Sequence, residues 1–72
     1  MDKILVIGAG AWGTALANIL AIKNNDVYIW ARSTNVFSEI NNKFSNKKYF
    51  KNFQLSKKLK ALTGKINVKE FD

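Results

Sequence analysis

The sequence contains no cysteine and no histidine among its 72 residues. Without cysteine the chain has neither a disulfide framework nor a thiolate nucleophile, which suits a reducing compartment. Without histidine it lacks the commonest general base and the commonest metal ligand. These two absences remove much of the usual catalytic and metal-ligand chemistry, and we predict no metal site.

Long hydrophobic runs are also missing, because the longest wholly apolar stretch is far too short to cross a bilayer. The first residues show neither the basic region nor the cleavage site of a signal peptide. We therefore expect a cytoplasmic protein with no membrane insertion. A chain of this length forms at most one small domain, 1–72, and folding buries about 60% of the unfolded surface at this size.

Acidic residues are few, with 5 against 12 lysines and arginines, and the net charge is +7. Nine of the eleven lysines lie between Lys43 and Lys69, and some of them alternate with aromatic residues. This pattern leaves open a basic module that binds nucleic acid or an acidic membrane surface. However, asparagine and isoleucine are abundant as well, as an AT-rich coding sequence would produce. We favour solvated lysines with inward-packed aromatics, and no nucleic-acid partner.

The most informative stretch covers residues 3–22, KILVIGAGAWGTALANILAI. Its apolar run at 4–7 is typical of a buried parallel strand. The glycines that follow, Gly8, Gly10 and Gly13, have the G-x-G-x-x-G spacing. Apolar residues then recur on one face of a helix: Trp12, Ala15, Leu16, Ile19 and Leu20. A strand, a glycine turn and a helix in this order predict a dinucleotide-binding turn.

Each of the three glycines has a physical role in such a turn. Gly8 allows a tight bend out of the strand, and Gly10 lets the backbone approach a pyrophosphate. Gly13 lets the helix pack closely on the strand. The N–H groups and the positive dipole end of the helix would hold the phosphates. The alternative is a glycine-rich turn without a ligand.

A second strand is predicted at residues 26–30, DVYIW, which are rich in β-branched and aromatic residues. The preceding helix is expected to end near Lys23, since Asn24 and Asn25 readily adopt the left-handed conformation that closes a helix. The fold class is therefore α/β. We predict a Rossmann-type β-α-β dinucleotide-binding unit within a truncated, doubly wound parallel sheet.

The end of this second strand indicates which cofactor fits. NAD-binding units carry an Asp or Glu there, which binds the ribose 2′-hydroxyl. This chain has Arg32 and Ser33 instead, and a guanidinium pairs well with a 2′-phosphate. We predict a preference for NADP(H), with NAD(H) possible. A solvated arginine at a strand end is the alternative.

The rest of the chain gives weaker patterns. Ser33 or Thr34 is expected to cap a second helix. That helix has an apolar face made of Val36, Phe37, Ile40 and Phe44. A short helical turn fits the spacing of Leu55, Leu59 and Leu62, and the apolar residues after them are too few to define an element.

The block 8–17, GAGAWGTALA, resembles the amino-terminal signature of bacterial NAD(P)-dependent sn-glycerol-3-phosphate dehydrogenases. The resemblance covers about the first sixty residues and is much more specific than the glycine spacing alone. It continues through 27–32, Ile40 and Asn41, Asn46, Tyr49 and Phe50, and Leu55.

The resemblance implies an oxidoreductase that interconverts dihydroxyacetone phosphate and sn-glycerol 3-phosphate for phospholipid synthesis. It places Ala11 and Trp12 at the cofactor in the glycine loop, Arg32 and Ser33 at the 2′-phosphate, and Tyr49 at a further cofactor-side position. In the family the catalytic lysine and the groups that bind the small phosphorylated substrate lie in a later helical domain. No lysine here matches the catalytic one, so we assign no catalytic residue.

Departures from the family pattern are few. Family members often have serine in place of Ala11. Because alanine lacks the hydroxyl, this chain loses one phosphate hydrogen bond at that position. They also often have prolines where this chain has Lys51 and Ser56, which implies a less rigid loop. We expect residues 1–72 to be an amino-terminal fragment that is inactive alone and able to self-associate through the open edge of its first strand. Two competing hypotheses are a fragment of a different nucleotide-dependent oxidoreductase or flavoprotein, and a remnant without activity.

Overall fold

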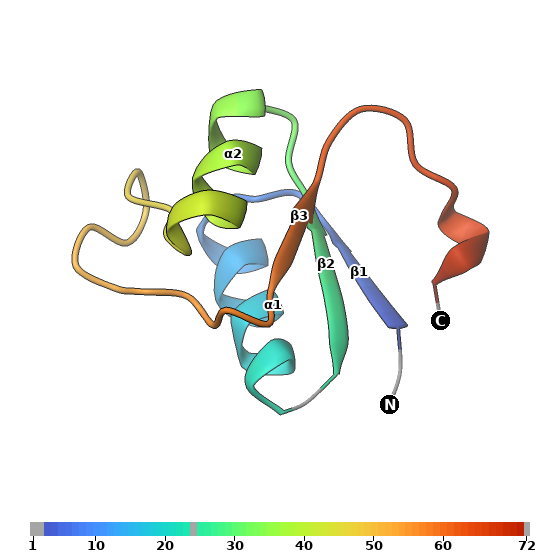
Figure 1. The fold of residues 1–72 in the computed structure, drawn as a ribbon, viewed down its shortest axis with the longest axis horizontal. Coiled ribbons are helices and arrows are strands. Elements are labelled where there is room, and N and C mark those ends of the chain that lie inside the picture. Colours follow the sequence, from blue (N-terminus) through green and yellow to red (C-terminus); the bar gives the residue numbers. More distant parts are fainter. Residues whose placement is uncertain (1–2, 24, 72) are drawn as a thin grey trace.

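The computed structural model describes residues 3–23 and 25–71. A parallel sheet is formed by β1 (Lys3–Ile7), β2 (Asp26–Trp30) and β3 (Lys60–Leu62), in the order β1-β2-β3. Helix α1 (Ala11–Ile22) joins β1 to β2, and α2 (Thr34–Lys43) follows β2. A single 3-10 turn, η1 (Val68–Glu70), lies near the end of the chain. Both helices lie on one side of the sheet and the η1 segment lies on the other (Figure 1).

The register of the sheet places alternate residues of β2 against the helices. Lys3 is opposite Asp26 at one end of the β1–β2 pair. Val27 and Ile29 are fully buried, as expected for residues two apart in a strand that share one face. They form one hydrophobic core with residues of both helices and of the 55–61 segment: Ala17, Ala21, Ile40, Leu55, Leu59 and Ala61. The predicted α/β class and the β-α-β unit are confirmed.

Helix α1 ends where the sequence predicts, with Lys23 as its C-cap. The expected left-handed closure does not occur at Asn25, because Phe44 is the only non-glycine residue with a positive φ in the described chain. Asn25 instead donates from its backbone N and its Nδ2 to the Leu20 carbonyl, at 3.4 and 3.1 Å. That side-chain bond satisfies a helix-end carbonyl without a left-handed residue. Asn24 lies outside the described residues.

The apolar stripe of α1 does form one helix face, but much of that face is exposed. Trp12, Leu16 and Ile19 are all largely exposed. The residues that α1 buries are smaller or polar: Thr14, Ala17, Asn18 and Ala21. The exposed stripe borders a hollow of about 440 Å³ next to β1, which pairs only with β2 in the described chain.

The predicted helical turn over Leu55, Leu59 and Leu62 is wrong, because Leu62 belongs to β3. This strand has only 3 residues and is completed by a distant side chain. Asn41 donates from Nδ2 to the Ala61 carbonyl at 3.0 Å and accepts from the Ala61 N–H at 2.8 Å. Leu55 and Leu59 are buried all the same, from a segment without helix.

Helix α2 begins as predicted, with Ser33 as its cap. The Ser33 Oγ accepts from the backbone N–H groups of Asn35 and Val36, at 3.2 and 3.4 Å. The helix ends at Lys43, and the φ of 53° at its C-cap, Phe44, lies in the left-handed region. Phe44 therefore turns the chain towards the loop that follows.

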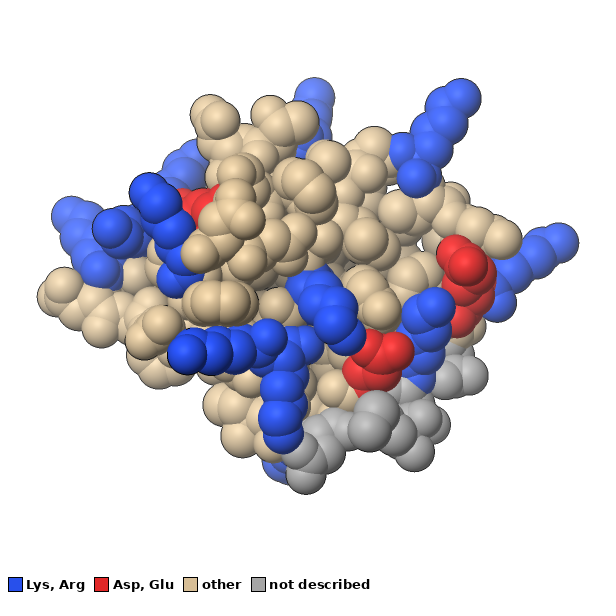
Figure 2. Space-filling view, in the orientation of Figure 1, with Lys and Arg blue, Asp and Glu red and all other residues tan. Residues whose placement is uncertain are grey.

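The charged side chains do not form a single basic patch on the face seen in Figure 2, where Lys and Arg project from several separate places. One of the few acids is paired, since Lys60 Nζ lies 3.0 Å from Asp26 Oδ1. In residues 3–23 and 25–71, no helix is both long and apolar enough to span a membrane.

Candidate functional site

A cavity of about 150 Å³ opens where β1 and β2 end. We call it the strand-end cavity, and its lining residues are Ala9, Gly10, Ala31, Arg32, Ser33, Val36, Lys48 and Tyr49. Ligands of open parallel sheets bind outside the carboxyl ends of the strands, which is where this cavity lies. The structure thus brings together four predicted site residues from three separate parts of the chain, namely Gly10, Arg32, Ser33 and Tyr49.

The turn between β1 and α1 depends on two glycines that do not line the cavity. Gly8 has a φ of +104°, in the region that favours glycine, and its N–H donates to the Trp30 carbonyl at 2.9 Å. A Cβ added at Gly13 would lie 2.0 Å from the Gly8 carbonyl oxygen. The bend predicted at Gly8 and the close helix packing predicted at Gly13 are both confirmed, the first by its positive φ and the second by the space that a Cβ would lack.

Gly10 is the N-cap of α1 and leaves the start of the helix open. Within the described chain, no side chain accepts a hydrogen bond from the first N–H groups of α1, and its first turn contains no acidic residue. A Cβ at Gly10 would have no described heavy atom within 4 Å. Uncapped N–H groups and the positive end of the dipole suit an anion such as a phosphate. The contrast with α2, which Ser33 caps, makes α1 the helix whose start fits a pyrophosphate.

Arg32 and Ser33 are exposed residues on the wall formed after β2. The Ser33 Oγ already accepts two backbone hydrogen bonds, so its own hydroxyl proton is left to donate to a ligand. Among the residues that the structure describes, no Asp or Glu lines the strand-end cavity. The wall therefore offers a guanidinium and a hydroxyl donor where an NAD-specific site offers a carboxylate.

Lys48 and Tyr49 form the wall contributed by the loop after α2. Lys48 Nζ lies 5.6 Å from the centroid of the Tyr49 ring, within the range of a cation–π contact. Sequence reasoning misses Lys48 as a site residue, because an isolated lysine in a basic segment is typical of a solvated surface. Its position next to Tyr49, which the resemblance assigns to the cofactor side, is the signal that could find it.

Ala11 and Trp12 lie in the first turn of α1 but do not line the strand-end cavity. Trp12 is 91% exposed and borders the hollow beside β1 instead. The cofactor contacts that the resemblance implies for these two residues stay predictions.

Segment 45–47, which leads to Lys48 and Tyr49, is held by Glu39 of α2. The Ser45 hydroxyl donates to Glu39 Oε2 at 2.6 Å, and the Lys47 N–H donates to the same oxygen at 2.8 Å. The Ser45 hydrogen bond is the main cause that lowers the pKa of Glu39 below its ordinary value of 4.5, with the Lys47 N–H and nearby lysines assisting.

We call the two hydrogen bonds that Glu39 accepts the Glu39 anchor. Because the pKa of Glu39 is lowered, the anchor stabilises the fold fully above the ordinary pKa of a glutamate, and this stabilisation is lost as the pH falls through the pKa of Glu39. We therefore expect the Lys47 amide signal in NMR spectra to titrate in acid, with a midpoint below 4.5. The change Glu39→Gln should abolish that titration while leaving the Ala61 amide unaffected. A Lys47 signal that titrates identically in both proteins would contradict the anchor.

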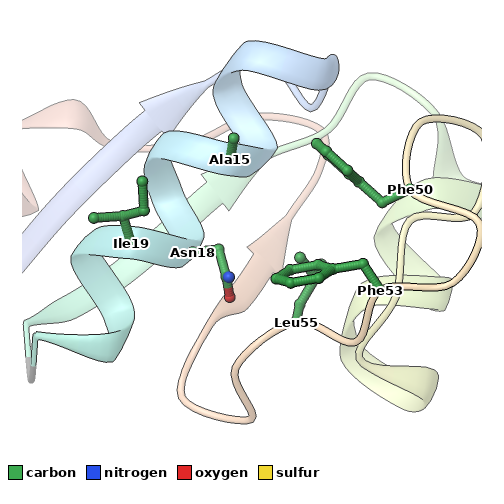
Figure 3. A pocket seen from close by; sticks show the side chains of 6 residues that line it. All are labelled: Ala15, Asn18, Ile19, Phe50, Phe53 and Leu55. Atoms are coloured by element: carbon green, nitrogen blue, oxygen red, sulfur yellow. The ribbon is translucent and has the colours of Figure 1, made fainter.

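A second cavity, of about 190 Å³, lies between α1 and the loop at 50–55 (Figure 3). It is lined by Ala15, Asn18 and Ile19 on the helix side and by Phe50, Phe53 and Leu55 on the loop side. The amide oxygen of its one polar side chain is already engaged, since Asn18 Oδ1 accepts from the Ser56 N–H at 2.7 Å. The described residues that line this cavity include no charged group for a phosphate, so the strand-end cavity is the better candidate.

Comparison with known proteins gives consistent matches. The model of a family described as NAD-dependent glycerol-3-phosphate dehydrogenase N-terminus matches residues 3–68. The glycerol-3-phosphate dehydrogenase (NAD(P)+) of Leuconostoc mesenteroides is 49% identical over 61 residues, which are 85% of this chain and 18% of that protein. The Bacillus subtilis enzyme of the same name is 41% identical over 63 residues, which are 88% of this chain and 18% of that protein.

A solved structure of Plasmodium falciparum glycerol-3-phosphate dehydrogenase has a TM-score of 0.77 and 30% sequence identity. The similarity covers 88% of this chain and 20% of that one. The chain thus spans about a fifth of the length of the relatives it matches. Its Rossmann-like sheet and the match over residues 3–68 lead to one conclusion: the chain belongs to the family of NAD-dependent glycerol-3-phosphate dehydrogenase N-terminal domains.

Proposed function

We propose that this chain holds the pyrophosphate and the adenosine end of a nicotinamide dinucleotide for a glycerol-3-phosphate dehydrogenase. The observation that carries the proposal is the open, uncapped start of α1 at Gly10, which shares one cavity with Arg32. The α1 N–H groups bind the pyrophosphate, and Tyr49 borders the adenosine end. When bound, the cofactor supplies the hydride that a dehydrogenase transfers.

The proposed cofactor is NADP(H) in preference to NAD(H). Arg32 places a permanent positive charge on the wall after β2, and Ser33 keeps one hydroxyl proton to donate. Both groups suit a 2′-phosphate, and the described lining of the cavity contains no carboxylate to repel it. NAD(H) lacks the 2′-phosphate and would bind without this charge-assisted contact.

The reaction proposed for the complete protein is the reduction of dihydroxyacetone phosphate to sn-glycerol 3-phosphate, a phospholipid precursor. Residues 1–72 form the amino-terminal part of the cofactor domain in this proposal, and the catalytic lysine and the substrate-phosphate groups lie elsewhere. The chain alone should therefore not oxidise NADPH. The exposed apolar residues beside the edge of β1, which pairs only with β2 in the described chain, favour self-association. A cytoplasmic location stays a prediction.

Calorimetric titration of the chain with NADPH tests the proposal. We expect saturable binding that the change Gly10→Ala weakens at least tenfold, because a Cβ at this position fills the space that the pyrophosphate approaches. We expect the change to leave the fold intact, since no described atom beyond Gly10 and its two chain neighbours lies within 4 Å of the added Cβ.

Lys51→Ala is the control, because Lys51 does not line the cavity. It should bind NADPH as the unmodified chain does. A chain that fails to bind, or a Gly10→Ala variant that binds equally well, would contradict the proposed function. Oxidation of NADPH by dihydroxyacetone phosphate above the buffer blank would show that the active site has been misplaced.

A further inference from the structure

Asn46 is a fully buried side chain that contacts both parts of the turn at the start of α1. Its Nδ2 donates to the Ala9 carbonyl at 3.1 Å and to the Thr14 Oγ1 at 3.0 Å. Ala9 lies between the first two glycines of the turn and lines the strand-end cavity, whereas Thr14 is a fully buried residue of α1. A single amide group therefore ties the glycine turn to the helix that follows it.

The backbone of Asn46 holds the other wall of the same cavity. Its carbonyl oxygen accepts from the N–H groups of Tyr49 and Phe50, at 3.1 and 2.9 Å. These bonds fold residues 46–50 into the turn that presents Lys48 and Tyr49 to the cavity. We call residues 8–13 the glycine turn and residues 46–50 the Tyr49 turn. Asn46 contacts both, and its bond to Ala9 joins positions that are 37 residues apart in the chain.

The unused half of the Asn46 amide shows what this residue contributes. Its Oδ1 is buried and has no hydrogen-bond partner among the described residues. A buried acceptor without a partner destabilises a fold, and an apolar side chain of similar size would fill the space without that cost. The two donated bonds are therefore the contribution that only the amide makes at this position.

We propose that Asn46 is the positioning residue of the dinucleotide site: it fixes the glycine turn relative to the Tyr49 turn and so sets the width of the strand-end cavity. The inference rests on the proposed function for its consequence in binding. Asn46 does not line the cavity, so it acts through Gly10 and Tyr49 and not by touching the cofactor.

The test compares Asn46→Ala with a structurally matched change, Asn41→Ala. Asn41 also makes two side-chain hydrogen bonds, to the backbone of Ala61, and it does not line the strand-end cavity. Both variants should lower the thermal midpoint. Affinity for NADP+ is then measured by calorimetry at a temperature where circular dichroism shows each protein folded.

We expect Asn46→Ala to weaken NADP+ binding by roughly tenfold or more, the equivalent of two ordinary hydrogen bonds, and Asn41→Ala to leave it unchanged. Thr14→Val is the milder variant, because it removes one acceptor of Asn46 and nearly keeps the side-chain shape. It should weaken binding by a smaller factor. Equal affinities in the Asn46 and Asn41 variants would overturn the proposal.

A measurement without ligand separates this inference from the proposed function. In amide NMR spectra, Asn46→Ala and Thr14→Val should shift the signals of Gly10 and Tyr49 together, and Asn41→Ala should shift neither. If the unmodified chain does not bind NADP+, the proposed function fails, and these shifts alone decide the positioning role. Gly10 and Tyr49 signals that stay in place in Asn46→Ala would overturn it.

Discussion

Replacing Gly13 with alanine is expected to abolish the cooperative fold of the chain. The added Cβ would lie 2.0 Å from the Gly8 carbonyl oxygen and 3.2 Å from its carbon. Both are backbone atoms, in a turn where Gly8 already has a φ of +104° and donates to the Trp30 carbonyl. Neither atom can move without separating β1 from β2 or pushing α1 off the sheet.

Helix propensity alone predicts that Gly13→Ala would stabilise the chain. Alanine is about 1 kcal/mol more favourable than glycine in the interior of a helix. A domain of this size has a core that supplies only about 3–5 kcal/mol, so a backbone clash of this severity exceeds the whole stability. A loss of stability in Gly13→Ala therefore indicates that α1 packs closely on the turn. A gain in stability would indicate that the glycine is merely tolerated in a helix.

Thermal melts followed by circular dichroism measure the effect, with Gly10→Ala as the matched control. Gly10 lies three residues earlier in the same turn and has open space where its Cβ would be. We expect Gly10→Ala to melt close to the unmodified chain and Gly13→Ala to show no cooperative transition. A Gly13→Ala protein that melts at or above the unmodified chain would contradict the packing geometry.

The sequence predicts those parts of the fold that depend on neighbouring residues. The apolar run of β1, the spacing of Gly8, Gly10 and Gly13, and the β-branched residues of β2 are all local patterns. Ser33 likewise caps α2 through N–H groups only two and three residues away. Each of these features is determined within a few positions of the chain, so periodicity and spacing are sufficient to find it.

The features that the sequence does not predict depend on distant partners. Strand β3 is only 3 residues long and needs Asn41, 20 positions earlier, to pair with Ala61. Asn46 joins Ala9 across 37 positions. A buried asparagine and a solvated one look the same in a chain this rich in asparagine. Only the folded backbone separates them, because it shows which amide finds carbonyl and hydroxyl partners.

The apolar stripe of α1 misleads for a related reason. The spacing of its apolar residues identifies a helix, but the residues that α1 buries are different ones. Thr14 and Asn18 contact Asn46 and Ser56 of the loop segment, and the small Ala17 and Ala21 join the core with Val27 and Ile29 of β2. Small residues on this face let α1 approach the sheet closely, as the contact at Gly13 also shows.

The strand-end cavity, of about 150 Å³, is smaller than the roughly 300–1,000 Å³ of a typical ligand pocket. A cavity of this size agrees with the proposal that the described residues hold only part of a dinucleotide.

Replacing Arg32 with aspartate is expected to reverse the cofactor preference. The substitution puts a carboxylate, the group that binds a ribose 2′-hydroxyl in NAD-specific sites, where a guanidinium faces the proposed 2′-phosphate. A charge-assisted hydrogen bond contributes about 1.5–3 kcal/mol, so NADPH should bind roughly ten- to a hundredfold more weakly. NADH has no 2′-phosphate and should bind as well as before, or better.

Calorimetric titrations of both cofactors measure this preference, in this chain and in a complete relative that carries the same segment. Lys51→Asp is the control, because it changes the net charge by the same amount at a residue that does not line the cavity. Any loss of NADPH affinity common to both variants reflects the net charge of the protein. Only the additional loss of affinity in Arg32→Asp belongs to the site. An unchanged ratio of NADPH to NADH affinity in Arg32→Asp would show that this arginine is a solvated residue at the end of β2. The cofactor choice would then have to be made elsewhere in the cavity, where Lys48 is the only other cation among the described lining residues.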